Sequence, residues 1–529
     1  MLPLHRFFLI AQCLLLCPAL DAMTIRMAPA SRPSAAAPLA AGAAASRSGD
    51  AGLGARSWDA GRIKLSAPLS SAEVRVHAVP MRAAPQAVPS APAASAAQPA
   101  AAEAAMAAAA PQAAETTPAP AGPESSLGSL QAAAELPQKS PAQEAAAARL
   151  FDGAQRPAEP KEWTLMVFLN GHNNLDRFGE INIKQMEKVG SNDRVNIVVQ
   201  WASLGKPTRR LLVQRSESGQ VGSPILETLP AVDMGSADQL YEFIRWAHEH
   251  FPAQRYMVDL WDHGAGWHVS KNGAFSPLDI SWDDQTGHNI TTEQLGDVMR
   301  RVQALIGRPL DVLGFDACLM AMGEVVAQVA DSVHYVAASE QTEPGAGWPY
   351  EKFLRQWLAA GADDGVALIK AITEQYVASY PNNVNFSGLD LAQLPALMAA
   401  AQALSAELVG LDGAKFAEAS RTATAARRYY STDYGDFMDF VTKLANAPGA
   451  LVSAPVVAAM TAAHQALVVA NAATPDLRGS NGMSIWLPMN SYLWNKYGAR
   501  YVGLAWSRLT GWGNFVRRLA GAKGTDSRA

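Results

Sequence analysis

The sequence predicts an α/β fold whose central sheet is mostly parallel. From about Lys161 onward, apolar runs of strand length alternate with helical patterns. The apolar runs are nearly continuous, which is typical of parallel strands because helices cover both faces of such a sheet. The chain has 529 residues and 49% of them are hydrophobic, so it can supply a core of that size.

The region before this fold has a different composition. Residues 1–22 begin with a basic segment, continue with an apolar run at 7–16 and end in small residues, which is typical of a secretory signal peptide. A buried N-terminal segment is the alternative interpretation. Residues 23–160 are rich in Ala and Pro, and Trp58 is the only aromatic residue between Met23 and Leu150. They predict a disordered, low-complexity prosegment or spacer in an exported protein that is periplasmic, on the cell surface or extracellular.

The elements of the fold follow in order along residues 161–395, the expected core. A helix is expected from Ser236 or Asp238 to His250, and another after a capping box formed by Thr291 and Gln294. A third helix is predicted at 319–330. Apolar runs predict strands at 163–169, 195–201, 211–214, 256–261, 310–315 and 334–338.

The remaining residues, 396–529, are expected to be a helical and strand extension that packs on the core. Ala-rich stretches at 397–444 and 452–472 predict helices, and 484–488 predicts a late strand. Trp506, Trp512 and Phe515 predict the buried seam of closing helices. This extension is interpreted as structural support without chemistry of its own.

Two reactive residues follow buried strands. His263 comes after the strand at 256–261, and Cys318 comes after the strand at 310–315. Ligands bind beyond the carboxyl ends of the strands in such sheets. The helix predicted to start after Cys318 would favour its thiolate through its positive end, and the amides of Gly264 and Cys318 would donate to an oxyanion.

Each of these residues also has a structural explanation. A cysteine after a buried strand is often part of the core, and a histidine between Asp262 and Gly264 can cap a turn. Their equivalent positions at two strand ends favour a cysteine nucleophile with an imidazole partner. Sequence spacing does not establish that the two strands are neighbours.

Several segments resemble the clostripain family of cysteine endopeptidases. They are 163–169, 259–267, 314–322 and 339–350, with further blocks at 434–439, 482–488 and 510–515, and they run in order over residues 162–518. The resemblance implies a caspase-like α/β/α sandwich, shared with caspases, legumain and gingipains. It also implies a Cys-His dyad in which Cys318 is the nucleophile and His263 the general base or proton shuttle.

The resemblance further implies cleavage after Arg, or after Arg and Lys, because Asp316 lies two residues before the nucleophile, where relatives carry the specificity acid. Residues i and i+2 of a strand share a face, so Asp316 can share a face with Cys318. A cap for the following helix is the alternative role for Asp316. Glu340 and Glu343 are expected to add negative potential near the pocket, or to be solvated loop residues, and Trp348 is expected to form a pocket wall.

Two departures from the family pattern stand out. His172 replaces the Asp that usually opens the block after the first strand, and residues 345–347 lack an acid that some relatives carry. Relatives are zymogens that cut themselves between the catalytic His and Cys, here within 267–289, whose one basic residue is Lys271. Upstream sites expected for removal of the prosegment are Lys139, Arg149, Arg156 and Lys161.

The chemistry requires no cofactor. Calcium is claimed for some family members, but with Gly287 at the sixth position of a calcium loop, Trp282 takes the first position and Asn289 the eighth, so the EF-hand pattern fails. Calcium binding nevertheless stays possible, without assigned ligands. No Cys or His pair has the spacing of a zinc site, so no metal ligands are predicted.

The expected partners are protein or peptide substrates with Arg or Lys at the cleavage site. A net charge of −5 without a long basic run excludes a nucleic-acid or anionic-membrane binder, and the apolar run at 7–16 is too short to span a membrane. We expect a monomer, as one chain or as processed chains.

A catalytically silent, secreted binding or scaffold protein on the same fold is the alternative function. Retention of His263, Gly264, Asp316 and Cys318 argues against it. A serine hydrolase is disfavoured because Ser339 lacks a glycine elbow, and no metal cluster supports a metal enzyme.

Overall fold

The computed structural model describes residues 160–268 and 279–521. The signal peptide expected at 1–22 and nearly all of the prosegment expected at 23–160 therefore lie outside the described residues. Within the described chain, no helix has the length and apolar character needed to cross a membrane.

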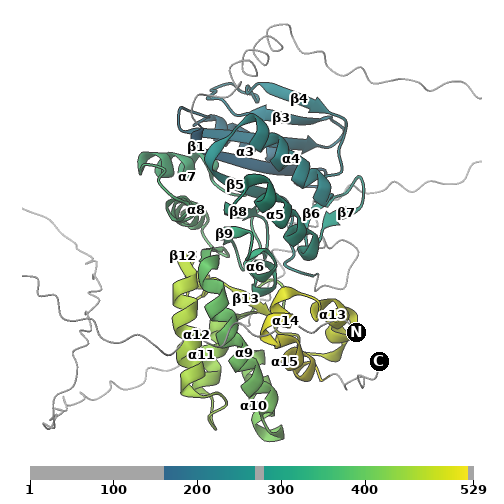
Figure 1. Ribbon diagram of the computed structural model, residues 1–529, viewed down its shortest axis with the longest axis vertical. Helices are drawn as coiled ribbons and strands as arrows, with labels where there is room; N and C mark the ends of the chain where they lie inside the picture. Colours follow the sequence, from purple (N-terminus) through teal and green to yellow (C-terminus); the bar gives the residue numbers. More distant parts are fainter. Residues whose placement is uncertain (1–159, 269–278, 522–529) are drawn as a thin grey trace, which may run out of the picture. The chain divides into compact units, whose positions relative to one another are not determined.

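A nine-stranded mixed sheet forms the centre of the described chain (Figure 1). Its five middle strands, β9, β8, β5, β1 and β2, are parallel, and antiparallel strands flank them on both sides. The mostly parallel sheet predicted from the continuous apolar runs is thus confirmed. In sheet order the strands are β12 (Val468–Ala473), β10 (Asn385–Asp390), β9 (Val333–Ala338), β8 (Leu310–Asp316), β5 (Ala253–Trp261), β1 (Lys161–Gly171), β2 (Val195–Ser203), β3 (Thr208–Leu212) and β4 (Ile225–Leu229).

Alternate residues of each central strand pack into two separate cores. In β1, Leu165 and Val167 belong to one core, whereas Met166 and Phe168 belong to the other. Successive side chains of a strand point to opposite faces, so both faces of the sheet are buried. This burial on both sides explains why the strands appear in the sequence as unbroken apolar runs.

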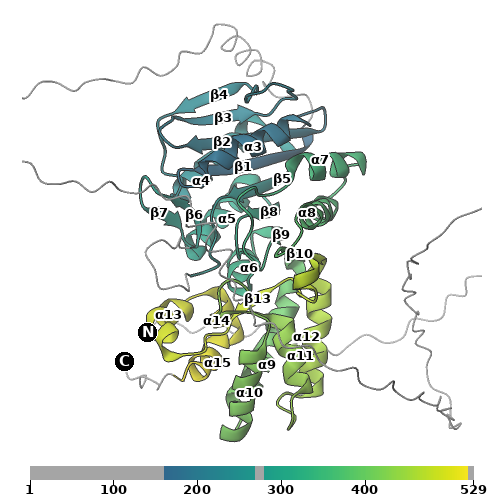
Figure 2. The same ribbon diagram turned by 180° about the vertical axis from the view of Figure 1, so that it is seen from behind.

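Helices cover both faces, which gives the expected α/β/α sandwich (Figures 1 and 2). The capping box predicted at Thr291 and Gln294 is present at the start of α5. One face is covered by α3 (Asp176–Glu187), α7 (Tyr350–Ala359) and α8 (Gly365–Ser379), and the other by α4 (Ala237–His250), α5 (Thr292–Ile306) and α6 (Gly323–Val329).

The prediction of helix up to residue 472 is wrong at its end. Residues Val468–Ala473 form β12, which pairs antiparallel with β10 and so extends the main sheet. The expected boundary at 396 also falls inside α9, so the last part of the chain shares a core with the sheet. Its helices are α9 (Leu394–Gly410), α10 (Gly413–Ala425), α11 (Phe437–Asn446), α12 (Ala454–Leu467), α13 (Ser491–Tyr501), α14 (Ala505–Thr510) and α15 (Trp512–Leu519).

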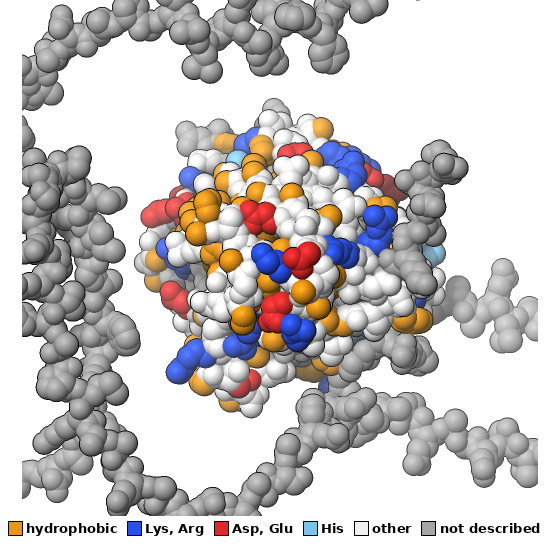
Figure 3. Space-filling model, turned by 90° about the horizontal axis from the view of Figure 1, so that it is seen from below, with side chains coloured by type: hydrophobic (Ala, Val, Ile, Leu, Met, Phe, Trp, Pro, Cys, Tyr) orange, Lys and Arg blue, Asp and Glu red, His pale blue; other side chains and the backbone are white. Residues whose placement is uncertain are grey.

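Four shorter strands and two 3-10 turns complete the described chain. The strand expected at 484–488 is shorter, and it pairs with β11 outside the main sheet. Acidic, basic and apolar side chains are interspersed on the face in Figure 3. The remaining elements are β6 (Ile280–Asp283), β7 (His288–Ile290), β11 (Tyr434–Asp436), β13 (Ser484–Trp486), η1 (Leu391–Gln393) and η2 (Pro475–Leu477).

Candidate active site

Strands β5 and β8 are direct neighbours and run parallel. Trp261 is in register with Asp316, and the amide of Asp262 donates to the Asp316 carbonyl at 3.2 Å. His263 and Cys318 each follow two residues after that register pair. The structure therefore brings the two residues to adjacent strand ends, which the sequence spacing could not establish.

Gly264 lies directly against the backbone of Cys318. A Cβ at position 264 would lie 2.4 Å from the Cys318 carbonyl oxygen and 3.1 Å from the side chain of Met320. Only glycine fits so close to another backbone. The two backbone segments expected to supply oxyanion donors are thus in contact, and their donor role stays a prediction.

The ring of His263 is held by a residue that the sequence did not single out. Its Nε2 lies 2.6 Å from Oδ1 of Asn174, in the loop that follows β1. Desolvation lowers the pKa of His263, and the charge of Asp284 acts in the opposite direction. A lowered pKa keeps the imidazole neutral near pH 7, which is the form that can accept a proton.

A buried carboxylate fixes the backbone just before His263. The Asp262 side chain accepts from Nδ2 of Asn170 at 2.7 Å and from Nδ2 of Asn173 at 2.6 Å. Both asparagines also donate to the Trp282 carbonyl, which ties the end of β1 to β6. The loop that begins at Asn170 is therefore hydrogen-bonded to the segment that carries His263. In the sequence, only the polar residues of this loop could have indicated the contact.

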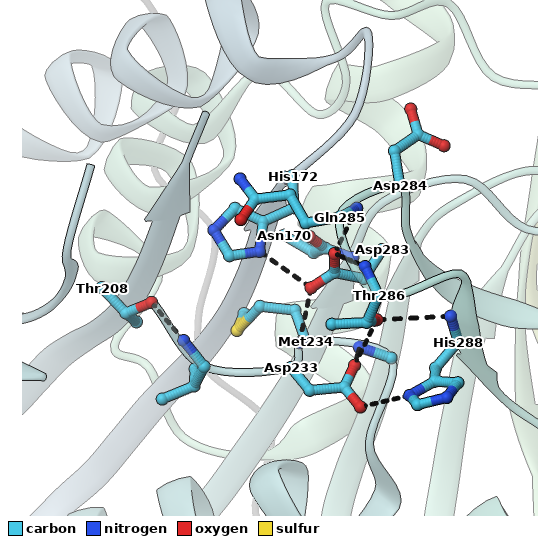
Figure 4. A network of polar contacts seen from close by, with 12 residues as sticks. Asn170, His172, Thr208, Asp233, Met234, Asp283, Asp284, Gln285, Thr286 and His288 are labelled. Carbon is cyan, nitrogen blue, oxygen red and sulfur yellow. Dashed lines mark hydrogen bonds and ion pairs between the residues drawn. The ribbon is translucent and has the colours of Figure 1, made fainter. Parts of the chain in front are cut away.

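His172, which departs from the family pattern, forms a separate buried pair (Figure 4). Its Nδ1 lies 2.8 Å from Oδ2 of Asp283, and both side chains are fully buried. Asp283 also accepts from the amides of Met234, Gln285 and Thr286. Burial alone would raise the pKa of Asp283, but the contacts with His172 and these amides outweigh it and lower the pKa. His172 thus stabilises the β6–β7 hairpin through its contact with Asp283.

The same contacts argue against calcium at residues 283–293. Both carboxylate oxygens of Asp283 already face donors, so they do not fit a cation. His288 and Thr286 are bonded in turn to Asp233, as Figure 4 shows. In residues 160–268 and 279–521, no group of three or more His, Cys, Asp or Glu side chains could hold a metal ion.

The helix predicted to start directly after Cys318 is shorter than expected. It begins at Gly323, and residues 319–322 instead bond to distant segments: the amide of Ala321 donates to the Ser339 carbonyl, and the amide of Ser484 donates to Ala321. Leu319 has a φ of 65°, a strained value for a leucine. Cys318 is therefore not at a helix N-terminus, and the helix dipole does not act on its thiolate.

The thiol of Cys318 is hydrogen-bonded to the backbone of Glu343. Its Sγ accepts from the Glu343 amide at 3.1 Å and lies 3.7 Å from the Glu343 carbonyl oxygen. Desolvation raises the pKa of Cys318 to about 12, and the nearby acids add to this against the effect of the Glu343 amide. The thiol is therefore protonated at neutral pH in this conformation.

Asp316 belongs to a buried cluster of acids beside Cys318. Its carboxylate accepts from the Trp348 amide at 3.0 Å and from the Tyr350 hydroxyl at 2.9 Å. The Glu343 carboxyl contacts it directly and also accepts from Nε1 of Trp348 at 3.2 Å. Trp348 is fully buried, and its expected role as a pocket wall stays a prediction. Asp316 does not cap the following helix, which starts seven residues later.

Glu340 lies in a different cluster from Asp316. Its carboxyl accepts from Nδ2 of Asn385 and from the amide of Gly482, both at 2.9 Å. Burial raises its pKa well above the usual value. The structure thus joins Glu340 to the C-terminal part of the chain, and Glu343 rather than Glu340 accompanies Asp316.

Most of the expected processing sites lie outside the described residues. These are Lys139, Arg149, Arg156 and Lys271. Lys161 is the first residue of β1, where it pairs with Ala253 and its Nζ donates to the Asn192 carbonyl at 2.6 Å. Its position in the sheet contradicts the expectation of an accessible site.

Comparisons with known proteins agree with this geometry. The model of the Clostripain family matches residues 167–518. The chain is 24% identical over 230 residues to clostripain of Hathewaya histolytica, a match that spans 37% of this chain and only 42% of that protein.

Two solved structures share the fold. One is an inactive zymogen C11 protease from Parabacteroides distasonis, with a TM-score of 0.52, 18% identity, and coverage of 67% of this chain and 99% of that one. The other is a secreted C11 cysteine protease from Bacteroides thetaiotaomicron in complex with an irreversible peptide inhibitor. It has a TM-score of 0.52, 20% identity, and coverage of 66% and 99%. At these identities the likeness establishes the α/β/α fold.

Proposed function

The chain belongs to the clostripain family, since the family model matches well over half of its length, and on this premise we propose that it is an exported cysteine endopeptidase that cleaves after Arg or Lys. The observation that carries the proposal is the pairing of β5 with β8, which places His263, Cys318 and Asp316 at adjacent strand ends.

In the proposed reaction, Sγ of Cys318 attacks the scissile carbonyl while His263 takes the thiol proton. The amides of Gly264 and Cys318 donate to the oxyanion that forms. Collapse of the tetrahedral intermediate releases the amine, to which His263 gives the proton, and leaves a thioester. Water deprotonated by His263 then hydrolyses the thioester and restores the thiol.

The raised pKa of Cys318 bears on the timing of proton transfer. Because the thiol is protonated in the described conformation, its proton leaves to His263 as the nucleophile attacks. The hydrogen bonds between the thiol and the Glu343 backbone also support a resting zymogen state. The relative from Parabacteroides distasonis is described as an inactive zymogen.

The acidic pocket supports the proposed specificity. Asp316 and Glu343 place two carboxyls beside Cys318, and a guanidinium can bond to carboxylates at two points, whereas an ammonium is a single point charge. The expected substrates are proteins or peptides with Arg or Lys on the acyl side of the scissile bond. Export is supported by the signal peptide expected at 1–22 and by a relative described as secreted.

The proposal is tested with the chain lacking residues 1–22 and with its Cys318→Ala variant. Paired fluorogenic peptides ending in Arg, Lys or Asp are supplied before and after brief trypsin treatment. We expect cleavage after Arg, then Lys, that disappears in the variant. Cleavage that persists in the variant would show that Cys318 is not the nucleophile and would contradict the proposed mechanism. A folded protein that stays inactive after trypsin treatment would favour the silent scaffold.

A further inference from the structure

A second buried acid lies in the middle of the strand next to that of Asp316. Asp259 occupies the centre of β5 and is 1% exposed. Its register partner in β8 is Gly314, where a Cβ would lie 3.3 Å from Oδ1 of Asp259. The glycine thus leaves room for a carboxyl at a position where the flanking residues Val258 and Leu260 pack in the core.

Asp259 is connected to Asp316 by two routes. Its Oδ1 accepts from the Asp316 amide at 3.2 Å. The Tyr350 hydroxyl lies 2.7 Å from Oδ2 of Asp259 and 2.9 Å from Oδ2 of Asp316. A single phenol oxygen therefore bridges the two carboxyl groups.

This bridge requires an additional proton. A tyrosine hydroxyl has one hydrogen to donate, so it can satisfy only one of two ionised carboxylates. At the other contact, two oxygen lone pairs would face each other unless that carboxyl is protonated and donates to the tyrosine oxygen. Two buried carboxyls so close together cannot both ionise easily.

The surroundings supply no compensating positive charge. Desolvation has the largest effect on the pKa values of Asp259, Asp316 and Glu343. The next largest effects come from one another and from uncharged donors, and none of these comes from a Lys, Arg or His of the described chain. Tyr376, Tyr380 and Cys318 are the other titratable groups that face the pocket. The missing cation would thus have to come from outside the described chain.

We propose that Asp259 is a specificity-determining residue, which shares one proton with Asp316 through Tyr350 and releases it when a cationic substrate side chain binds. This inference rests on the proposed function. In the empty pocket, one proton moves between the two carboxyls. A guanidinium at Asp316 replaces that proton, which leaves to solvent. The guanidinium then donates to Asp316 and the Tyr350 hydroxyl donates its one hydrogen to Asp259, so the net charge of the two carboxyls with their occupant is the same before and after binding.

The proposal makes recognition of a basic residue dependent on pH. Burial raises the pKa of Asp316 to about 8 and that of Asp259 to about 6, with the charge of Asp259 also acting on Asp316. Below this range the proton must be removed for the cation to bind, so the preference for Arg weakens as pH falls.

The test compares two peptides that differ only in having Arg or citrulline on the acyl side of the scissile bond. The two side chains have the same shape, but citrulline is uncharged. The ratio of their kcat/KM values cancels the titration of His263 and Cys318. For the active enzyme we expect this ratio to rise at least tenfold between pH 6 and pH 8, because one proton gives a slope of up to about tenfold per pH unit.

In Asp259→Asn, the ratio should rise less steeply with pH than in the wild type, because desolvation still raises the pKa of Asp316 but the charge of Asp259 no longer adds to it, and the ratio should exceed the wild-type ratio at pH 6. The pH profile for the citrulline peptide should not change, whereas a merely structural defect would lower it. Glu324→Gln is the matched control, since Glu324 is also fully buried and accepts from a tyrosine hydroxyl, that of Tyr501, at 2.8 Å. Its ratio should follow the wild type.

The outcomes separate this inference from the proposed function. A wild-type ratio that favours Arg but stays constant between pH 6 and pH 8 would overturn the role of Asp259 without any variant. A pH slope in Asp259→Asn that is as steep as in the wild type would overturn it too. Proteolysis without any preference for Arg over citrulline would overturn both the pocket assignment and this inference.

Discussion

The ring of His263 is oriented by Asn174, whose Oδ1 lies 2.6 Å from Nε2 of the histidine. An amide oxygen can only accept, so this contact favours the tautomer in which Nε2 carries the proton and Nδ1 carries the lone pair. Asn174 therefore selects which nitrogen of His263 can take a proton from a thiol. It acts through His263, as a positioning residue.

Removal of the Asn174 side chain should lower kcat and leave KM nearly unchanged. In Asn174→Ala the imidazole can rotate and exchange its tautomers, and misplacement of a catalytic group by about 1 Å can cost about 100-fold in rate. In Asn174→Asp the carboxylate would favour the imidazolium, so the acidic limb of the kcat profile should move to higher pH. Both constants are measured from pH 5 to pH 9.

Asn192 provides the matched control for this prediction. Its side-chain oxygen is likewise a hydrogen-bond acceptor, from the amides of Arg194 and Val195, in a loop between α3 and β2. Asn192→Ala should reduce thermal stability without a change in the kcat profile. If Asn174→Ala kept full kcat with the wild-type pH profile, the orienting role would be wrong.

Alkylation of Cys318 should be slow at neutral pH and should accelerate as pH rises. A thiol whose pKa is raised to about 12 contains almost no thiolate at pH 7, and its thiolate fraction grows about tenfold per pH unit up to pH 9 and beyond. Without residues 1–22, Cys318 is the only cysteine of the chain, so iodoacetamide labelling reports on it alone. The unfolded protein, which should react like free cysteine, is the control. A labelling rate that levels off below pH 8 would contradict the raised pKa.

The sequence predicted the strands around the site because burial on both faces leaves a local pattern. The runs that end before His263 and Cys318 are apolar whatever their partners are. Which strands pair depends instead on long-range contacts such as that between Trp261 and Asp316. The pairing, and with it the proximity of the two reactive residues, could therefore not be predicted from spacing.

The errors of prediction have the same origin. Residues 319–322 have an apolar pattern compatible with a helix, but the Ser339 carbonyl and the Ser484 amide bond to Ala321 there. Asp259 lies within the apolar run at 256–261 without a local pattern that assigns it a role, and only the structure connects it with Tyr350. Tertiary contacts override local preference where distant segments supply the hydrogen bonds.

Asp316 and Glu340 should differ sharply in their effect on specificity. Asp316→Asn removes the acid at the base of the pocket and should lower kcat/KM for Arg peptides by about 100-fold or more. In Glu340→Gln the change should be less than about threefold. Burial raises the pKa of Glu340 well above its usual value, and its carboxyl accepts from Asn385 and Gly482, which an amide oxygen can also do. Assays with Arg peptides at pH 7.5 distinguish the two, and the reverse order of effects would place Glu340 in the pocket.

Arg500 should stabilise the fold by neutralising a buried acid. From α13, its guanidinium donates to the carboxylate of Asp279, to that of Glu293 at 2.8 Å and to the Trp267 carbonyl at 2.8 Å. The Asp279 side chain is fully buried, whereas that of Arg500 is 30% exposed. Arg500→Met leaves Asp279 without its cation and should cost about 2–3 kcal/mol, below the range for a fully buried pair.

The loss should depend on pH and on Asp279. Burial already raises the pKa of Asp279 against the effect of Arg500, so removing Arg500 raises it further. The folded variant then binds a proton more tightly than the unfolded chain, and its stability falls as pH rises. Urea unfolding should therefore reveal a larger loss at pH 7 than at pH 5, and Asp279→Asn should restore part of it in the double variant. Arg301→Met, which breaks an exposed pair with Asp238, should cost less than about 1 kcal/mol at either pH. Equal losses for the two arginine variants would mean that the charge of Asp279 is solvated.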